Sequence, residues 1–297
     1  MAPATEPITP TATPAISLRS LNREFRRPRR TLTGPAPVVH AVRDVSLEVP
    51  AGQRLGIVGE SGSGKSTLLR LLCGLDQPTS GEVWVEGRPV HGQSARQLGW
   101  LRRRMQLVFQ DPMGSLDPRM RVRDIIAEPM VAQRMPGRRE RVAELLEAVG
   151  LAADAGDRYP HQFSGGQRQR ISVARALAPG PHILVADEPV SALDVSVRAQ
   201  VLNLVDELVD RMGLTLVFVS HDLSVVRHVC DRVAVMRRGE VVEEGPTEEL
   251  YAAPRHPYTR ELLASVPRLD EALAGRTAED LAAGAREAAR ELGEAGP

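Results

Sequence analysis

The sequence has 297 residues, of which 42% are hydrophobic and 26% are charged, enough for one large or two modest globular domains. Its formal net charge is zero, which argues against a broad electrostatic surface for nucleic acid. No apolar run approaches the roughly 18 residues of a membrane span, and the Pro/Thr/Ala-rich start lacks the apolar core of a signal peptide. We therefore expect a cytoplasmic chain with a disordered leader over residues 1–15.

Strand and helix patterns alternate along the chain. A strand begins at Ile16 and is expected to lie at a sheet edge, and a basic, Pro-containing loop follows over 23–37. Strand patterns recur at 38–49, 54–59, 81–87, 105–110, 182–187 and 215–220, and a hairpin is expected over 232–245 with its turn at Arg238 and Gly239. Helical patterns cover 65–73, about 116–151, the stretch behind Ser164, 195–212 and 223–230.

This alternation predicts an α/β fold with a mostly parallel core sheet. The helical stretch in the middle is predicted to be an inserted subdomain of about 111–165 within one domain of 16–250. Residues 251–297 are interpreted as a partly helical C-terminal extension, in which the sequence TAED at 277–280 caps a last helix.

The stretch GESGSGKST carries the only lysine of the sequence, Lys65. Gly59, Gly64, Lys65 and Ser66 fit the spacing of a phosphate-binding loop, with a strand before it and a helix after it. The glycines let backbone N–H groups turn toward phosphate oxygens, and the helix N-terminus adds its positive dipole end. A compact ammonium reaches the β- and γ-phosphates inside a tight loop, where a planar guanidinium needs more room.

Hydrolysis also requires a carboxylate for Mg²⁺ and a group that activates water. Asp187 and Glu188 end the apolar run HILVADEP, where Asp187 can reach the metal through water and Glu188 can polarise the attacking water. His221 follows the next strand and is assigned a contact with the γ-phosphate from its placement alone. Ser66 supplies a further oxygen to Mg²⁺.

A second anion-binding helix start occurs in FSGGQRQR, at Ser164, Gly165 and Gly166. A chain with a complete phosphate loop needs no second γ-phosphate cradle of its own. The arrangement that uses both is a head-to-tail dimer, in which the Ser-Gly-Gly of each subunit closes the ATP site of its partner.

Taken together, these motifs resemble the ATP-binding cassette (ABC) family over nearly the whole ordered chain. GESGSGKST resembles its Walker A loop, HILVADEP its Walker B strand, and FSGGQ its signature motif with Phe163 in place of the commoner Leu. The resemblance implies a P-loop NTPase fold with an antiparallel β subdomain and an inserted helical subdomain. It also makes Gln110 the Q-loop glutamine that helps to hold Mg²⁺, places the D-loop at 191–194, and makes His221 the H-loop switch.

An adenine-stacking aromatic residue is implied upstream of the phosphate loop, with Phe25 as the candidate and His40 as the alternative. Lys65, Glu188 and His221 are then the catalytic residues, and Ser66, Gln110 and Asp187 the metal ligands. The ATP-binding set is Phe25, Gly59, Glu60, Ser61, Gly62, Ser63, Gly64, Lys65, Ser66, Thr67, Gln110, Ser164, Gly165, Gly166, Gln167 and Asp194.

Three longer stretches, at 105–130, 186–204 and 253–267, are similar to the ATPases of oligopeptide, dipeptide and nickel importers, and GKSTLLRLLCGLDQPTSGEV resembles the second of the two ATPases that such systems carry. The resemblance implies a peripheral subunit on the cytoplasmic face of the membrane. Its implied partners are a second ATPase, two permeases and, indirectly, an extracytoplasmic solute-binding protein. Some relatives hold an iron–sulfur cluster in a cysteine-rich C-terminal region; this tail has no cysteine, so no cluster is expected.

Several alternatives stay open. The importer subfamily takes up peptides, nickel or other small solutes, and the sequence does not name the solute or say whether the second ATPase is identical. A DNA-repair or ribosome-associated ABC ATPase is a further alternative, disfavoured by the short distance between Gly59 and Ser164 and by the single cassette. A regulatory subunit with a decayed site is disfavoured by the intact motifs, and a P-loop kinase leaves FSGGQ unexplained.

Overall fold

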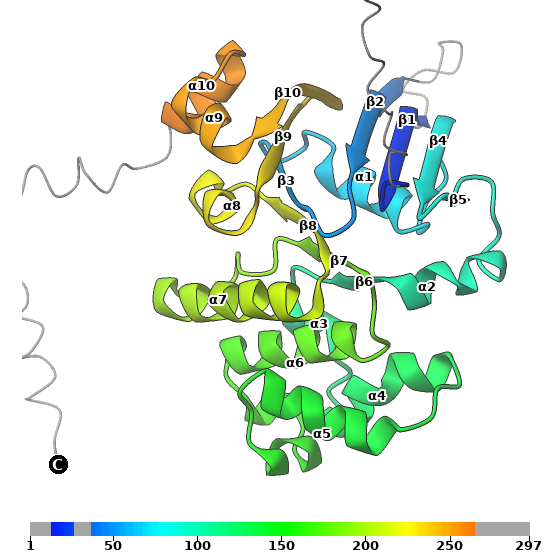
Figure 1. The fold of residues 1–297 in the computed structure, drawn as a ribbon, viewed down its shortest axis with the longest axis vertical. Helices are drawn as coiled ribbons and strands as arrows, with labels where there is room; N and C mark the ends of the chain where they lie inside the picture. Colours follow the sequence, from blue (N-terminus) through cyan, green and yellow to red (C-terminus); the bar gives the residue numbers. More distant parts are fainter. Residues whose placement is uncertain (1–12, 27–36, 265–297) are drawn as a thin grey trace, which may run out of the picture.

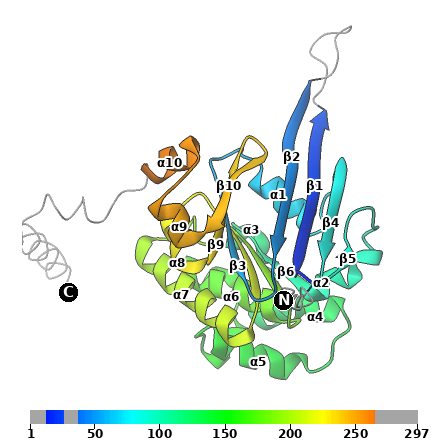
Figure 2. The same cartoon turned by 45° about the horizontal axis from the view of Figure 1, so that its top comes forward.

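The computed structural model describes residues 13–26 and 37–264. The helix cap predicted at 277–280 lies outside the described residues. Two sheets lie side by side with helices around them (Figures 1 and 2). The first is antiparallel, in the order β2-β1-β4-β5. Its strands are β1 (Ile16–Arg26), β2 (Val38–Val49), β4 (Ser80–Val85) and β5 (Arg88–Pro89).

The second sheet has the order β10-β9-β3-β8-β7-β6 and is parallel apart from β10. Its members are β3 (Arg54–Val58), β6 (Met105–Val108), β7 (Ile183–Asp187), β8 (Thr215–Ser220), β9 (Arg232–Arg237) and β10 (Glu240–Pro246). The predicted fold class, with a mostly parallel core sheet and an antiparallel β part, is confirmed. The predicted hairpin is formed by β9 and β10, and both turn residues, Arg238 and Gly239, have positive φ.

The expectation for β1 is wrong in two respects. β1 lies between β2 and β4 and is therefore an interior strand. It also continues to Arg26, through residues expected to form a basic loop, with Phe25 opposite Val39 of β2. Ile16 pairs with β2 on one side and with β4 on the other, and this two-sided pairing makes the strand interior.

Ten α-helices lie in the described part of the chain. They are α1 (Lys65–Leu72), α2 (Leu101–Arg104), α3 (Pro112–Ser115), α4 (Val122–Ala132), α5 (Arg138–Ala148), α6 (Gly165–Leu177), α7 (Val195–Met212), α8 (Leu223–Val229), α9 (Thr247–Ala252) and α10 (Pro257–Ala264). Short 3₁₀ turns occupy Gln97–Gly99, Ala153–Asp157 and Pro160–Gln162. Across residues 13–26 and 37–264, no helix combines the length and the hydrophobicity that a bilayer span requires.

Two cores divide the interior between these layers. Leucines of α1 pack between the two sheets, against Leu18 and Val83 of the antiparallel sheet and Val217 of the parallel one. The other core joins the opposite face of the parallel sheet to α6, α7, α8 and the helices around α4 and α5. α1 is thus held between two sheets, which fixes the loop that precedes it.

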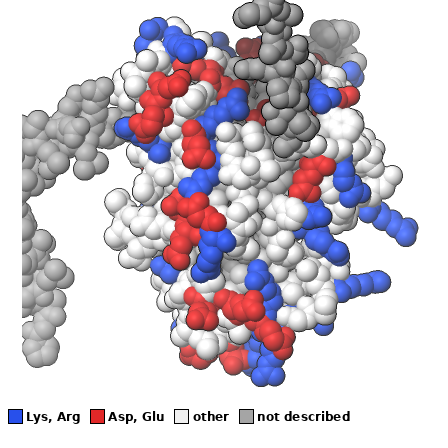
Figure 3. All heavy atoms as spheres, viewed as in Figure 1, with Lys and Arg blue, Asp and Glu red and all other residues white. Residues whose placement is uncertain are grey.

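The central helical stretch is interrupted: α4 ends at Ala132, and α5 begins after Gly137, whose φ is +66°. The limits of about 111 and 165 for a helical subdomain stay a prediction, as do the domain limits of 16–250 and 251–297. Figure 1 places α9 and α10 beside β10, away from α4 and α5. Acidic and basic side chains are interspersed on the face in Figure 3, in keeping with the zero net charge.

Candidate ATP-binding and hydrolysis site

The carboxyl ends of four neighbouring parallel strands meet at one edge of the sheet. The order β3-β8-β7-β6 brings together the loop after Val58, His221 after β8, Glu188 after β7 and Gln110 after β6. Ligands of open α/β sheets bind outside this edge. A cleft of about 860 Å³ lies there, and its lining includes residues from all four of these loops.

The loop from Gly59 to Gly64 lines this cleft with all its residues except Ser63. Gly64 has φ +109°, and a Cβ on it would lie 2.3 Å from the carbonyl oxygen of Ala41, so a side chain there meets both strain and a clash. A Cβ on Gly59 would lie 2.2 Å from the carbonyl oxygen of Met236. The loop leads directly into α1, whose first-turn N–H groups have no acceptor within the helix. The sequence pattern for a phosphate-binding loop thus has the strand–loop–helix geometry that it requires.

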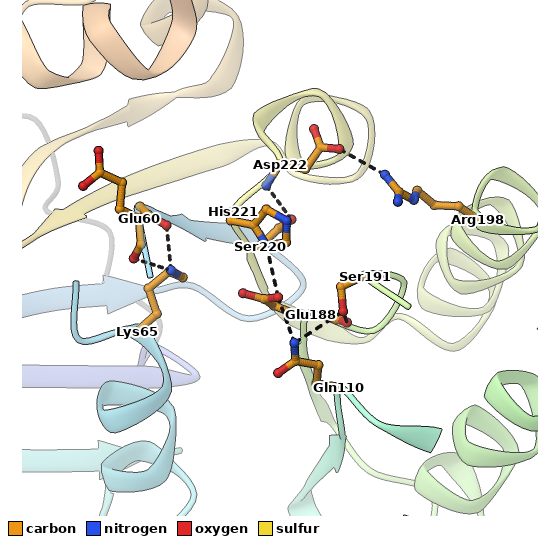
Figure 4. Close-up of polar contacts among 10 residues, drawn as sticks. Glu60, Lys65, Gln110, Glu188, Ser191, Arg198, Ser220, His221 and Asp222 are labelled. Carbon is orange, nitrogen blue, oxygen red and sulfur yellow. Dashed lines mark hydrogen bonds and ion pairs between the residues drawn. The ribbon is translucent and has the colours of Figure 1, made fainter. Parts of the chain in front are cut away.

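Lys65 is only 5% exposed, and its ammonium folds back onto the loop. Its Nζ donates to the carbonyl oxygens of Gly59 (2.6 Å) and Glu60 (2.9 Å) (Figure 4). Burial lowers the pKa of Lys65, while nearby carboxylates, that of Glu188 first, act in the opposite direction. The ammonium is therefore a desolvated positive charge placed beside acidic groups at the cleft.

Glu188 is held in an unusual backbone conformation, with φ +44°. Such a conformation in a residue other than glycine persists only where its surroundings impose it. Here the Glu188 N–H donates to the carbonyl of Val219 at 2.9 Å. Its carboxylate oxygen Oε2 lies 3.1 Å from Gln110 Nε2 and 3.1 Å from His221 Nδ1 (Figure 4). The strain and these contacts aim the carboxylate into the cleft.

Asp187 ends β7 beside Glu188. Burial, followed by the charge of Glu188, raises the pKa of the Asp187 carboxyl, and the ammonium of Lys65 acts in the opposite direction. Asp187 does not line this cleft; it lines a neighbouring groove that also includes Gln110. The three predicted metal ligands offer the Asp187 carboxylate, the Ser66 hydroxyl at the start of α1 and the amide oxygen of Gln110, and the last two residues line the cleft. Oxygen donors of these kinds are what Mg²⁺ prefers, so the residues present fit that ion.

Not all the predicted residues meet at this cleft. Gly59–Gly62, Gly64–Thr67, Gln110, Glu188 and His221 line it, whereas Phe25 is not among the described lining residues. The guanidinium of Arg23 lies 4.5 Å from the centre of the Phe25 ring. His40 lines the cleft, so the geometry favours the alternative adenine-stacking residue over Phe25. Phe25 lies outside the lining because β1 extends to Arg26 and carries Phe25, whereas the lining residues of this region come from the next strand, β2.

The second glycine motif lies at the start of α6. Ser164 caps this helix by accepting a hydrogen bond from the Gln167 N–H at 3.3 Å, and the Gln167 side chain accepts the Ser164 N–H at 3.0 Å. Ser164, Gly165 and Gln167 are exposed, and none of them lines the cleft of the same chain. Asp194, which precedes α7, is also exposed and outside the cleft.

The sequence did not single out several residues at this site. Val39, Ala41, Glu261 and Leu262 line the cleft, and the hydroxyl of Tyr258 contacts the loop. The first two alternate on β2 as ordinary strand residues do. The others come from α10, and only the fold brings that helix to the loop.

The fold and this cleft define a P-loop ATPase. The family model for the ABC transporter matches residues 42–191, and that for the oligopeptide/dipeptide transporter C-terminal region matches 242–292. The chain therefore belongs to the ABC transporter family and is an ATPase of that family.

Relatives and a solved structure agree with this assignment. The chain is 49% identical over 260 residues to the oligopeptide transport ATP-binding protein OppF of Bacillus subtilis, covering 86% of this chain and 83% of the relative. It is 46% identical to the dipeptide transport ATP-binding protein DppF of Haemophilus influenzae, covering 86% and 79%. The dimeric ATP-binding cassette MJ0796 bound to ADP and Pi superposes with a TM-score of 0.69 at 31% identity, covering 78% of this chain and 98% of that one.

Proposed function

We propose that this chain is the ATP-hydrolysing subunit of an importer for dipeptides or oligopeptides, bound to the cytoplasmic face of the membrane. The observation that carries the hydrolytic part is the placement of Glu188, which Gln110 and His221 hold at the cleft that contains Lys65. A decayed, regulatory subunit would have no need to keep a strained carboxylate in this position.

Within this proposal, each residue has a distinct task. Lys65 gives its ammonium to the β- and γ-phosphates, and the loop N–H groups cradle their oxygens. Glu188 polarises the attacking water, and His221 orients Glu188 while contacting the γ-phosphate. Ser66, Asp187 and Gln110 would hold Mg²⁺, which would neutralise charge that develops on the phosphates.

The position of Ser164 favours a dimer. The exposed start of α6 offers N–H groups to an anion, yet it lies outside the cleft of its own chain. In a head-to-tail pair, Ser164–Gln167 of each subunit would close over the ATP of the other, with Asp194 at the contact. The partner is either a second copy or a sister ATPase. ATP closes this pair, hydrolysis reopens it, and the permeases change state accordingly.

Light scattering of the Glu188→Gln variant tests this pairing. The variant should retain ATP without turning it over, so its mass should double in Mg-ATP if the chain pairs with itself. A variant that binds Mg-ATP and stays monomeric would contradict self-pairing and make an unlike ATPase the required partner.

A largely apolar groove beside Gln110 suits a permease segment. Its volume is about 1130 Å³, and Leu75, Leu107 and Phe109 contribute to its wall. Leu75 is 55% exposed and Phe109 45%. Exposed apolar side chains that gather in one groove are a feature of protein interaction sites. Because Gln110 lines both this groove and the ATP cleft, movement of a permease segment can reach the hydrolytic site through one side chain.

Peptide uptake is proposed on the C-terminal match and on the printed functions of the relatives. The test is a vesicle containing this chain, its sister ATPase and their two permeases, with the solute-binding protein added outside. ATP-dependent accumulation of labelled di- and oligopeptides is expected, and none in a matched Lys65→Ala complex. Uptake of nickel without peptide would identify nickel instead of peptides as the solute. A complex that takes up neither would contradict the assignment of peptides as the solute.

A further inference from the structure

The first turn of α10 rests on the phosphate-binding loop, far from it in sequence. Tyr258 is 1% exposed, and its hydroxyl accepts a hydrogen bond from the backbone N–H of Glu60 at 3.0 Å. The guanidinium of Arg237 lies over the Tyr258 ring, 4.5 Å from its centre. Burial raises the pKa of Tyr258, so the hydroxyl stays protonated at neutral pH.

This hydrogen bond acts on the same peptide unit that holds the lysine. The peptide between residues 59 and 60 contributes the Gly59 carbonyl, which accepts from Lys65 Nζ at 2.6 Å, and the Glu60 N–H, which donates to Tyr258. A peptide unit is planar and rigid, so fixing its N–H also fixes the direction of its carbonyl. Tyr258 and Lys65 are therefore linked through the planar peptide unit to which both side chains are hydrogen-bonded.

Contacts with β10 fix the position of α10 independently of the loop. Glu243 of β10 accepts hydrogen bonds from the backbone N–H groups of Arg255 (2.8 Å) and His256 (2.9 Å). The N–H of Tyr258 donates to Nδ1 of His256 at 3.2 Å. The start of α10 is thus tied to the sheet just before Tyr258.

The loop has a second support on its other side. The N–H of Gly239, in the turn between β9 and β10, donates to the carbonyl of Ser63 at 2.8 Å. This support belongs to the hairpin, whereas Tyr258 lies on a helix that follows it. Glu261 and Leu262 of the same helix line the ATP cleft. The C-terminal region therefore reaches the nucleotide site both by forming part of its wall and by a hydrogen bond to its loop.

We propose that Tyr258 is a positioning residue for ATP binding: its hydroxyl fixes the Gly59–Glu60 peptide, and through this peptide the Lys65 ammonium, so that the C-terminal region sets the affinity of the cleft for ATP. The proposal rests on the assignment of this cleft as the ATP site. A loop that is already in place loses less freedom when ATP binds, and affinity rises accordingly.

Tyr258→Phe is the direct test, because it keeps the ring and its contact with Arg237 and removes only the hydroxyl. A neutral hydrogen bond of this kind corresponds to about a two- to tenfold change in affinity. The dissociation constant and KM for Mg-ATP should rise by that factor. The kcat at saturating ATP should change by less than about twofold, because bound phosphates then hold the loop.

Tyr251→Phe is the matched control. Tyr251 is also in the C-terminal region, and its hydroxyl donates to the Leu223 carbonyl, away from the loop. Tyr251→Phe should leave both constants unchanged. Hydrogen exchange supplies a readout without turnover: the Glu60 amide should exchange faster in Tyr258→Phe and at the wild-type rate in Tyr251→Phe.

Three results would overturn the proposal. They are a wild-type ATP affinity in Tyr258→Phe, an equal loss of ATP affinity in Tyr258→Phe and Tyr251→Phe, or an unchanged exchange rate of the Glu60 amide in Tyr258→Phe. Wild-type protein that binds no Mg-ATP would instead refute the assignment of the cleft, and the proposal with it, so the two failures are distinguishable.

Discussion

Replacing Lys65 by alanine should weaken ATP binding strongly without unfolding the chain. The ammonium has three N–H donors, and among the described residues two of them are accepted by the carbonyls of Gly59 and Glu60. The remaining donor, and those released as phosphate enters, are available to phosphate oxygens. A hydrogen bond involving a charged group contributes roughly 1.5–3 kcal/mol, which corresponds to about a 10- to 150-fold loss of affinity for one such bond.

Titration with Mg-ATP by calorimetry measures this loss, and Arg70→Ala is the control. Arg70 is an exposed cation on the same helix, so its removal changes the net charge equally without touching the loop. Its ATP affinity should stay within about twofold of wild type, since an exposed charge contributes little. Thermal unfolding checks that both variants are folded. A folded Lys65→Ala protein with wild-type ATP affinity would refute the role assigned to the ammonium.

Three further predictions follow from particular contacts. Gly59→Ala should lower the unfolding temperature and abolish ATP binding, because its Cβ would lie 2.2 Å from the Met236 carbonyl oxygen. Gly99→Ala is the control and should do neither, since a Cβ there has nothing within 4 Å. Equal unfolding temperatures of the two variants would contradict this prediction. Burial alone would raise the pKa of Glu243, but hydrogen bonds lower it overall, so its stabilising contribution is complete above its ordinary pKa of 4.5 and is lost as pH falls through the lowered value. Urea unfolding should therefore show that Glu243→Gln reduces the free energy of unfolding at pH 7 and makes it fall less steeply below pH 4.5. An unchanged fall in that free energy would refute the stabilising role of the Glu243 carboxylate. Leu75→Asp, in the apolar groove, should reduce co-purification with the permeases and leave ATP binding unchanged, and full permease binding would argue against that docking surface.

The local parts of the site were predictable because they are continuous in sequence. The loop from Gly59 to Ser66 carries its own strand, glycines and helix, and Asp187 and Glu188 end a buried apolar run. The meeting of these segments at one edge follows from parallel strand order, which strands alternating with helices already indicate.

The parts that the sequence did not reveal depend on pairings between distant segments. The two-sided pairing of β1 requires β4, which the pattern of β1 alone does not indicate. The adenine-stacking residue stays a prediction, for which the longer β1 favours His40 over Phe25. Tyr258 is 198 positions from Glu60, and nothing in the helix that carries it indicates a contact with the loop. Such contacts depend on the sheet order, in which β9 pairs with β3 and β10 follows β9.

The turnover of Glu188→Gln tests the central claim most directly. The variant keeps the shape of the side chain and removes its charge, so ATP hydrolysis should fall by at least about 100-fold, the usual contribution of a positioned base, while Mg-ATP still binds. Turnover is measured by phosphate release from the assembled ATPase pair and compared with wild type. Wild-type binding with lost turnover is the predicted result, and near-normal turnover would contradict the account of Glu188 and of the site built around it.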